Sequence, residues 1–274
     1  MSEDSILTID IDRILREKAG TKYRYIPGFL INYLRRIVHE EELNAFIFNS
    51  RHLKGVEYLQ ACMQFLDVTL HIKGKEYLPA EDAAPCIFVS NHPLGGIDGV
   101  AIGAALGEHY HGRIRYMVND LLMNVAGLAP LCIPINKTGA QSRNLPEQIA
   151  QGLAEPNHLI MFPAGICSRR HKGIVSDLPW GKQFIVQSVK TQRDVVPLHF
   201  SGCNSDFFYR LANLREALGL KFNIEMIYLA DEMMKNRHKE FTLTVGKPIP
   251  WQTFDQSKRP LEWSRYVREI SYKL

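Results

Sequence analysis

The chain has 274 residues, of which 46% are hydrophobic and 23% are charged, and its formal net charge is +4. Such a composition is that of an ordinary globular protein with a full hydrophobic core. The small positive charge suits an anionic membrane surface or an acidic carrier protein, and it is far too weak to indicate a nucleic-acid-binding protein.

The compartment is indicated by features that the sequence lacks. Its five cysteines are scattered and show no C-x-x-C spacing, which favours a reducing environment. The first residues have neither the basic start nor the apolar stretch of a signal peptide, and no run reaches the length of about 18 apolar residues that a membrane-spanning helix needs. We therefore expect a cytoplasmic protein that associates peripherally with the inner face of the cell membrane.

The first part of the chain, residues 1–66, is predicted to be helical. Helical patterns cover Ser5–Lys18, the residues after Pro27, and Gly55–Leu66, and Gly20 is placed to end the first of them. We assign this part to an N-terminal helical extension.

The helix predicted after Pro27 is the candidate membrane contact. Phe29, Tyr33 and Ile37 recur at helical spacing in it, beside Arg35 and Arg36. Two interpretations remain open. The helix packs over the rest of the protein, or it lies in the headgroup region with its aromatic side chains inserted and its arginines directed at lipid phosphates.

Strands and helices alternate from Val68 onward. The expected strands are Val68–Ile72, Cys86–Ser90, Arg113–Val118, Leu131–Ile135, His158–Phe162, Val195–Phe200 and Phe241–Val245. The expected helices are Asp98–Glu108, Gln141–Leu153, Gly181–Thr191 and Ser205–Leu218. This rhythm predicts an α/β domain over residues 67–274, with a mostly parallel central sheet covered by helices.

The turn after the strand Cys86–Ser90 carries the most informative motif. His92 follows the strand, Gly95 and Gly96 permit a tight turn, and Asp98 opens the next helix. A histidine with a carboxylate close by can act as a general base and its orienting partner. Ligands of such sheets bind beyond the carboxyl ends of the strands, where this turn lies.

Three further blocks carry a resemblance to a known family. Phe162–Arg169 resembles the FPEGTRS block of the glycerolipid acyltransferases, Val196–Leu198 with Gly202 resembles their late V-P-x block, and Ile133–Lys137 stands where they have a basic block. With His92 and Asp98 these blocks cover roughly residues 68–245. The sequence therefore resembles the 1-acylglycerol-3-phosphate acyltransferases, which carry a His-x4-Asp motif.

The sequence departs from the family pattern in two places. The acid comes one residue later than in the family, and we expect the turn to absorb the additional residue so that His92 still pairs with Asp98. In the third block, Ala164, Ile166 and Cys167 replace the Glu, Thr and Arg of the family. The loss of that Arg weakens a phosphate site, a pattern that resembles the branch acting on lyso-ornithine and lyso-glycine lipids.

The resemblance implies roles for individual residues. His92 would be the general base, Asp98 would orient it, and the backbone N–H groups near Gly95, Gly96 and Gly165 would hold the oxyanion. Further candidate contacts to substrate or loop are Asn91, Lys137, Ser168, Arg169 and Arg170, of which the three cations would stand exposed in loops. Asp177, Trp180 and Lys182 resemble a weaker feature of the family, and Trp180 is expected to serve packing.

The expected activity is transfer of a fatty acyl group from acyl carrier protein or coenzyme A to the hydroxyl of a lyso-lipid, without a metal or redox cofactor. The first alternative is a 1-acylglycerol-3-phosphate acyltransferase, with Lys137, Arg169 and Arg170 replacing the lost Arg. The second is a non-catalytic membrane-binding relative, and the third is a thioesterase-like hydrolase that uses His92 on water. The absence of a G-x-S-x-G elbow argues against a serine hydrolase.

Overall fold

A seven-stranded sheet forms the centre of the computed structural model, which describes residues 9–119, 125–135 and 145–274. The strand order is β1-β9-β8-β2-β5-β3-β4, and every neighbouring pair is parallel except β8 with β9. The strands are β1 (Thr69–Lys73), β2 (Ile87–Ser90), β3 (Ile114–Asn119), β4 (Cys132–Ile135), β5 (His158–Met161), β8 (Val195–Phe200) and β9 (Glu240–Val245). The predicted α/β class with a mostly parallel sheet is confirmed.

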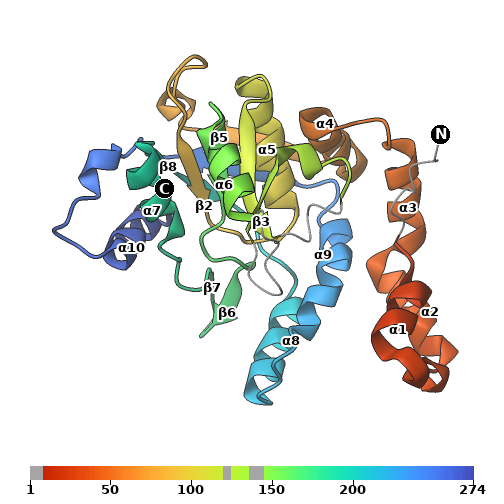
Figure 1. The fold of residues 1–274 in the computed structure, drawn as a ribbon. Helices are drawn as coiled ribbons and strands as arrows, with labels where there is room; N and C mark the ends of the chain where they lie inside the picture. The colour runs from red at the N-terminus through yellow and green to blue at the C-terminus, as the bar shows by residue number, and fades with distance from the viewer. Residues whose placement is uncertain (1–8, 120–124, 136–144) are drawn as a thin grey trace.

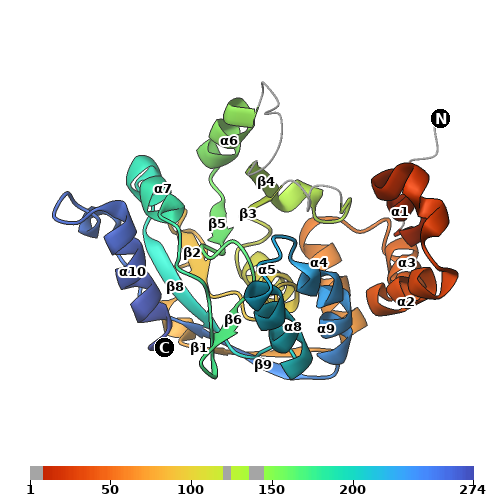
Figure 2. The ribbon, with the colours of Figure 1, turned by 90° about the horizontal axis from the view of Figure 1, so that it is seen from below.

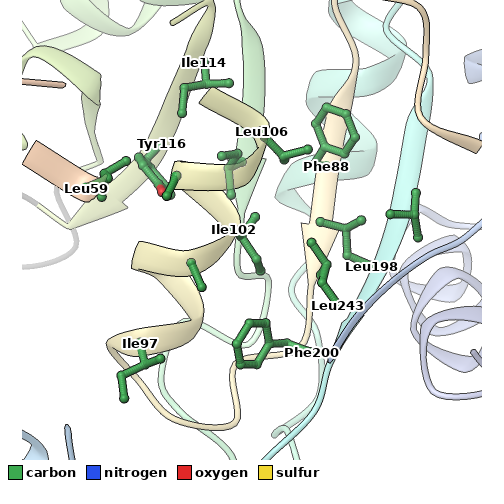
Figure 3. Packing of buried hydrophobic residues seen from close by; sticks show 14 of the residues in the cluster. Leu59, Phe88, Ile97, Ile102, Leu106, Ile114, Tyr116, Leu198, Phe200 and Leu243 are labelled. Atoms are coloured by element: carbon green, nitrogen blue, oxygen red, sulfur yellow. The ribbon is translucent and has the colours of Figure 1, made fainter. Parts of the chain in front are cut away.

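The central strands are buried on both faces, which explains their continuous apolar runs. Along β2, Phe88 contributes to one hydrophobic core, whereas Ile87 and Val89 contribute to the other. Figure 3 shows Ile102 and Leu106 of helix α5 (Ile97–His109) packed towards Phe88 and its neighbours on the sheet.

Helices cover the two faces in separate layers (Figures 1 and 2). One face is covered by α5 and by α4 (Gly55–Leu66), whose Leu59 and Leu66 belong to the same core as Phe88. The other face is covered by α6 (Leu145–Ala154), α7 (Gln183–Thr191) and α10 (Pro260–Ser271).

Helices α1 (Ile11–Ala19), α2 (Gly28–Val38) and α3 (Glu40–Asn49) stand beside the sheet, at the right of Figure 1. They are held there by α2, whose Tyr33 hydroxyl lies 2.8 Å from that of Tyr228. Phe29 is 77% exposed, but Ile37 is only 7% exposed. The membrane-surface interpretation requires both side chains to face outward, and the burial of Ile37 contradicts it at that position, because this side of α2 packs against the protein. No helix in the described ranges is long and apolar enough to cross a membrane.

Two insertions build the lower part of the molecule in Figure 1. The first, between β5 and α7, is a hairpin of β6 (Arg169–His171) and β7 (Ile174–Ser176). The second, between β8 and β9, contains α8 (Asp206–Ala217), the 3-10 helix η5 (Ile224–Tyr228) and α9 (Leu229–Lys235). The hairpin strands are too short to leave a periodic pattern in the sequence. A small core of Cys167, Phe208 and Tyr209 joins the hairpin to α8.

Candidate active site

His92 and Asp98 form a hydrogen-bonded pair at the carboxyl end of β2. His92 Nδ1 lies 3.0 Å from Asp98 Oδ2, so the predicted pairing is confirmed. The imidazole stacks on the ring of Phe162, with the ring centroids 4.2 Å apart. Because a carboxylate only accepts, Nδ1 must carry the proton. Nε2 is then the basic nitrogen of the ring.

The Asp98 carboxylate is buried and surrounded by donors. Besides the imidazole, it accepts from the backbone N–H groups of Leu94 (3.0 Å), Gly95 (3.3 Å) and Gly99 (2.9 Å). Burial alone would raise the pKa of Asp98, but His92 and the backbone donors outweigh it and hold that pKa below its usual range. Asp98 therefore remains ionised beside the imidazole.

The same pair shifts the pKa of His92 upward. Burial works to lower the pKa of the imidazole, but the charge and hydrogen bond of Asp98, with a smaller contribution from the charge of Asp177, outweigh it. A raised pKa makes Nε2 a stronger base, which suits proton abstraction from a hydroxyl near neutral pH.

The additional residue between His92 and Asp98 is absorbed in the glycine turn. Gly95 has a φ of +79°, a left-handed conformation that most residues avoid. A Cβ at this position would also stand 3.0 Å from the Cβ of Cys167. The turn brings the backbone of Leu94 and Gly95 onto Asp98, so the longer spacing still yields the pair.

Asp177 joins the His92 loop to the third block. Its Oδ1 accepts from the backbone N–H of His92 at 3.1 Å and from the hydroxyl of Ser168 at 2.6 Å, while its Oδ2 accepts from Trp180 Nε1 at 2.8 Å. The backbone N–H of Ser168 in turn donates to the carbonyl of His92 at 2.8 Å. Ser168 and Asp177 therefore fix the position of His92, and the predicted packing role of Trp180 is confirmed by its burial.

A cavity of about 490 Å³ opens beside His92. This volume is within the range of small-molecule sites. Its lining is mostly apolar and comes from α4, α5, β3, β4, β5 and the start of α7: Leu59, Val100, Tyr116, Met117, Leu128, Cys132, Met161, Phe162 and Phe184, with glycines at 95, 96, 99, 165 and 181. An apolar chain that filled it would bring its reacting end next to the imidazole.

The predicted loop contacts divide into those that touch the cavity and those that hold the loops. Asn91 is buried, and its amide both donates to and accepts from the backbone of Phe200, which ties the loop to β8. The N–H of Gly95 is used by Asp98, and that of Gly165 by the carbonyl of Phe162. Among the three glycine donors we predicted, Gly96 alone has an N–H without a partner in the described part of the chain.

The cations of the third block are already engaged. We expected Arg169 to be an exposed loop cation, which is wrong: its side chain is 1% exposed. It donates to Glu225 at 2.9 Å and to the carbonyl of Cys167 at 2.8 Å. Arg170 forms an ion pair with Asp206 of α8. The burial of Arg169 follows from the hairpin, which turns it towards η5.

Two further features of the site are Lys137 and the side chains that could hold a metal ion. Lys137 and the end of its block lie outside the residues that the structure describes. Across the described ranges, no group of three or more His, Cys, Asp or Glu side chains is placed to hold a metal ion.

Known proteins match this chain over almost its whole length. A family model described as an acyltransferase matches residues 13–274. A lyso-glycine lipid O-acyltransferase of Phocaeicola vulgatus is 62% identical over 274 residues, which cover all of this chain and 98% of that protein. A protein of the same name from Bacteroides thetaiotaomicron is 58% identical over the full length of both.

A solved structure shares the fold. The crystal structure of the 1-acyl-sn-glycerophosphate acyltransferase PlsC from Thermotoga maritima matches with a TM-score of 0.51 and 17% identity, over 96% of this chain and 93% of that one. At this identity the likeness concerns the fold alone. The family match and the two full-length relatives show more: the chain belongs to this acyltransferase family, and it is an enzyme that transfers acyl groups.

Proposed function

We propose that the enzyme transfers a fatty acyl group from a thioester to the hydroxyl of a lyso-glycine lipid. The observation that carries this proposal is the identity of 62% and 58%, over full length, with two proteins of that name. The pair of His92 and Asp98 beside an apolar cavity supports it, because acyl transfer to a hydroxyl needs a base next to a binding site for the acyl chain.

The site supports a direct transfer. Nε2 of His92 takes the proton from the acceptor hydroxyl as its oxygen forms a bond to the thioester carbonyl carbon. The carbonyl oxygen becomes an oxyanion, for which we assign the N–H of Gly96 as a donor. As the carbonyl re-forms, the carbon–sulfur bond breaks, and the leaving thiolate takes the proton from the imidazolium, which Asp98 stabilises meanwhile. No acyl-enzyme is required, because a thioester is already activated.

The third block supports an acceptor without a phosphate. Cys167 replaces the Arg of the family block, and it is buried against Arg169 and Gly95. Arg169 and Arg170 are paired with Glu225 and Asp206. A phosphate would therefore find no uncommitted arginine in this block, and forked arginine donors are what such an anion favours. Lys137 remains our candidate for the headgroup of the acceptor.

The test is a matrix of two donors and three acceptors with the purified enzyme. The donors are one acyl-carrier-protein thioester and the matching coenzyme A thioester; the acceptors are lyso-glycine lipid, lyso-ornithine lipid and lysophosphatidic acid. We expect kcat/KM to be highest for lyso-glycine lipid with one of the donors. Better use of lysophosphatidic acid would overturn the acceptor assignment, and release of free fatty acid without transfer would favour the hydrolase alternative.

We also propose that the enzyme sits on the inner face of the cell membrane through α2, which exposes both Phe29 and the basic Arg36. Vesicle flotation checks this contact. Phe29→Asp should release the protein from anionic vesicles, and unchanged flotation with a lower unfolding temperature would instead make α2 a packing element.

A further inference from the structure

The turn that follows α8 exposes large apolar side chains without a partner. Leu218, Leu220 and Phe222 are 63%, 51% and 70% exposed, and every residue from Ala217 to Phe222 is exposed. We call residues 218–222 the apolar turn. Single exposed apolar residues are ordinary on protein surfaces, but a cluster of large ones marks an interaction site.

The apolar turn is held in shape from inside. Arg215 donates to the carbonyl of Leu220 at 2.9 Å and to the carboxylate of Glu225 at 3.0 Å. Glu225 is fully buried and also accepts from Arg169 of the hairpin. Gly219 takes a φ of +66°, which lets the chain reverse after α8. A buried ion network thus fixes a turn whose apolar side chains point outward.

Figure 1 shows where this turn lies. Helix α8 runs downward past the sheet, on the side where β2 ends, and the α1–α2 pair and the tip of the β6–β7 hairpin lie on the same side. Figure 2 views the molecule from that side, with α8 and α9 between the hairpin and α2. The hairpin tip carries Ile174, which is exposed, beside Lys172, and the apolar turn carries Lys221. Apolar tips with adjacent lysines therefore project from the side of the molecule on which His92 follows β2.

We propose that the apolar turn inserts into the membrane surface as a second contact, separate from α2. The occupant is an anionic lipid layer. Its fluid interior accepts protruding apolar side chains, and its phosphates attract Lys221 and Lys172. The apolar turn lines neither the cavity beside His92 nor the pocket between α2 and α9. It protrudes from the surface, whereas the docking of a partner helix needs a groove. This inference rests on the proposed function only for the presence of a lipid substrate.

The experiment compares two doubly substituted proteins. In the first, Leu218→Asp is combined with Phe222→Asp. In the control, Leu261→Asp is combined with Val189→Asp, which adds the same charge at exposed positions of α10 and α7, away from α8 in Figures 1 and 2. Partition into mixed phosphatidylcholine and phosphatidylglycerol vesicles is measured by flotation. We expect the first protein to lose at least about tenfold in partition, since each buried apolar side chain contributes strongly, and the control to keep the native value.

Acyl transfer to a short-chain, water-soluble acceptor separates the two proposals. The Leu218→Asp, Phe222→Asp protein should retain native transfer to that acceptor, because it leaves His92 and the cavity unchanged, while its transfer to acceptor in vesicles falls in step with partition. If the native enzyme transferred acyl groups to none of the lyso-lipids but its vesicle partition still depended on the apolar turn, only the proposed function would be wrong. Equal partition of both substituted proteins and the native one would sink only the second contact.

A fluorescence measurement does not depend on the acidic substitutions. Phe222→Trp places an exposed indole in the turn, whereas the native Trp180 and Trp263 are buried and Trp251 is half-buried. Vesicles with brominated acyl chains should quench the Phe222→Trp protein more than the native one. If the Phe222→Trp protein were quenched no more than the native one, the turn would not insert into the membrane. The proposal would also be wrong if the native protein self-associated in gel filtration and Phe222→Asp abolished this self-association without changing vesicle partition.

Discussion

At the scale of single residues, the chemistry depends on one imidazole whose two nitrogens have different partners. Nδ1 faces the ionised Asp98, and Nε2 is the basic nitrogen beside the cavity. His92→Ala should lower the rate of acyl transfer by at least about two orders of magnitude, which is the usual contribution of a general base. Asp98→Asn should reduce it similarly, because an amide no longer fixes the tautomer.

Fold and vesicle binding serve as the controls for these two substitutions. His92 lies in a loop at the cavity, so far-UV circular dichroism and flotation of His92→Ala should remain native. Near-native turnover of His92→Ala would remove the pair from the mechanism.

Asp177 acts on the imidazole through its charge and through the loop that it holds. Because this charge helps to raise the pKa of His92, removing it should move the acid limb of kcat/KM to lower pH, while the plateau falls as the loop loosens. The base works only when neutral, so activity is lost below that pKa. The test protein combines Asp177→Asn with Trp180→Phe. The second substitution removes the indole N–H, which would otherwise face the amide N–H group introduced at position 177.

Trp180→Phe alone is the matched control, since it keeps the Asp177 charge and should keep the native acid limb. If the acid limb of kcat/KM stayed at its native pH in the doubly substituted protein, Asp177 would act only as a structural hydrogen-bonding residue.

At the scale of elements, the cavity is assembled from helices and strands far apart in the sequence. Leu128 precedes β4, Leu59 comes from α4, and both line the space beside His92. Leu128→Trp should fill part of the cavity. We expect kcat/KM to fall for long-chain acyl donors and to change little for short ones, because only a long chain needs the volume that the indole takes.

Leu128→Met, which conserves volume, is the control and should keep the native chain-length profile. A Leu128→Trp enzyme with an unchanged profile would place the acyl chain outside this cavity.

At the scale of the whole molecule, a buried histidine couples stability to pH. His158 opens β5, is fully buried, and accepts from the backbone N–H of Cys86 at 3.1 Å. Burial, with the nearby Arg113 and Arg193, lowers the pKa of His158 to about 4. Between that value and its ordinary value near 6.5, the unfolded chain binds a proton that the folded protein does not.

The free energy of unfolding should therefore decrease as the pH falls from about 6.5 to about 4, by up to about 3 kcal/mol from this group. Urea unfolding across that range measures it. His158→Gln should flatten the slope whatever its effect on the absolute stability, and a slope as steep as native would assign the acid sensitivity to other groups.

The sequence by itself determined the architecture and the reactive pair. The buried strands are continuous apolar runs and the helices are periodic, so local pattern specifies β2, β5, β8 and α5. His92 and Asp98 are six residues apart across one turn, and a tight turn after a buried strand leaves them few positions other than side by side. These features can be predicted because they depend on residues that are close together along the chain.

Only the tertiary structure decided which polar groups remain available. Arg169 is paired with Glu225, 56 residues away, and the backbone of His92 is held by Asp177, 85 residues away. Ile37 is buried because α2 packs against η5 and α9. A side chain's charge or hydropathy is visible in the sequence, but its partner is set by how distant elements pack, since burial obliges each ion to find a counter-ion and each apolar face to find a cover.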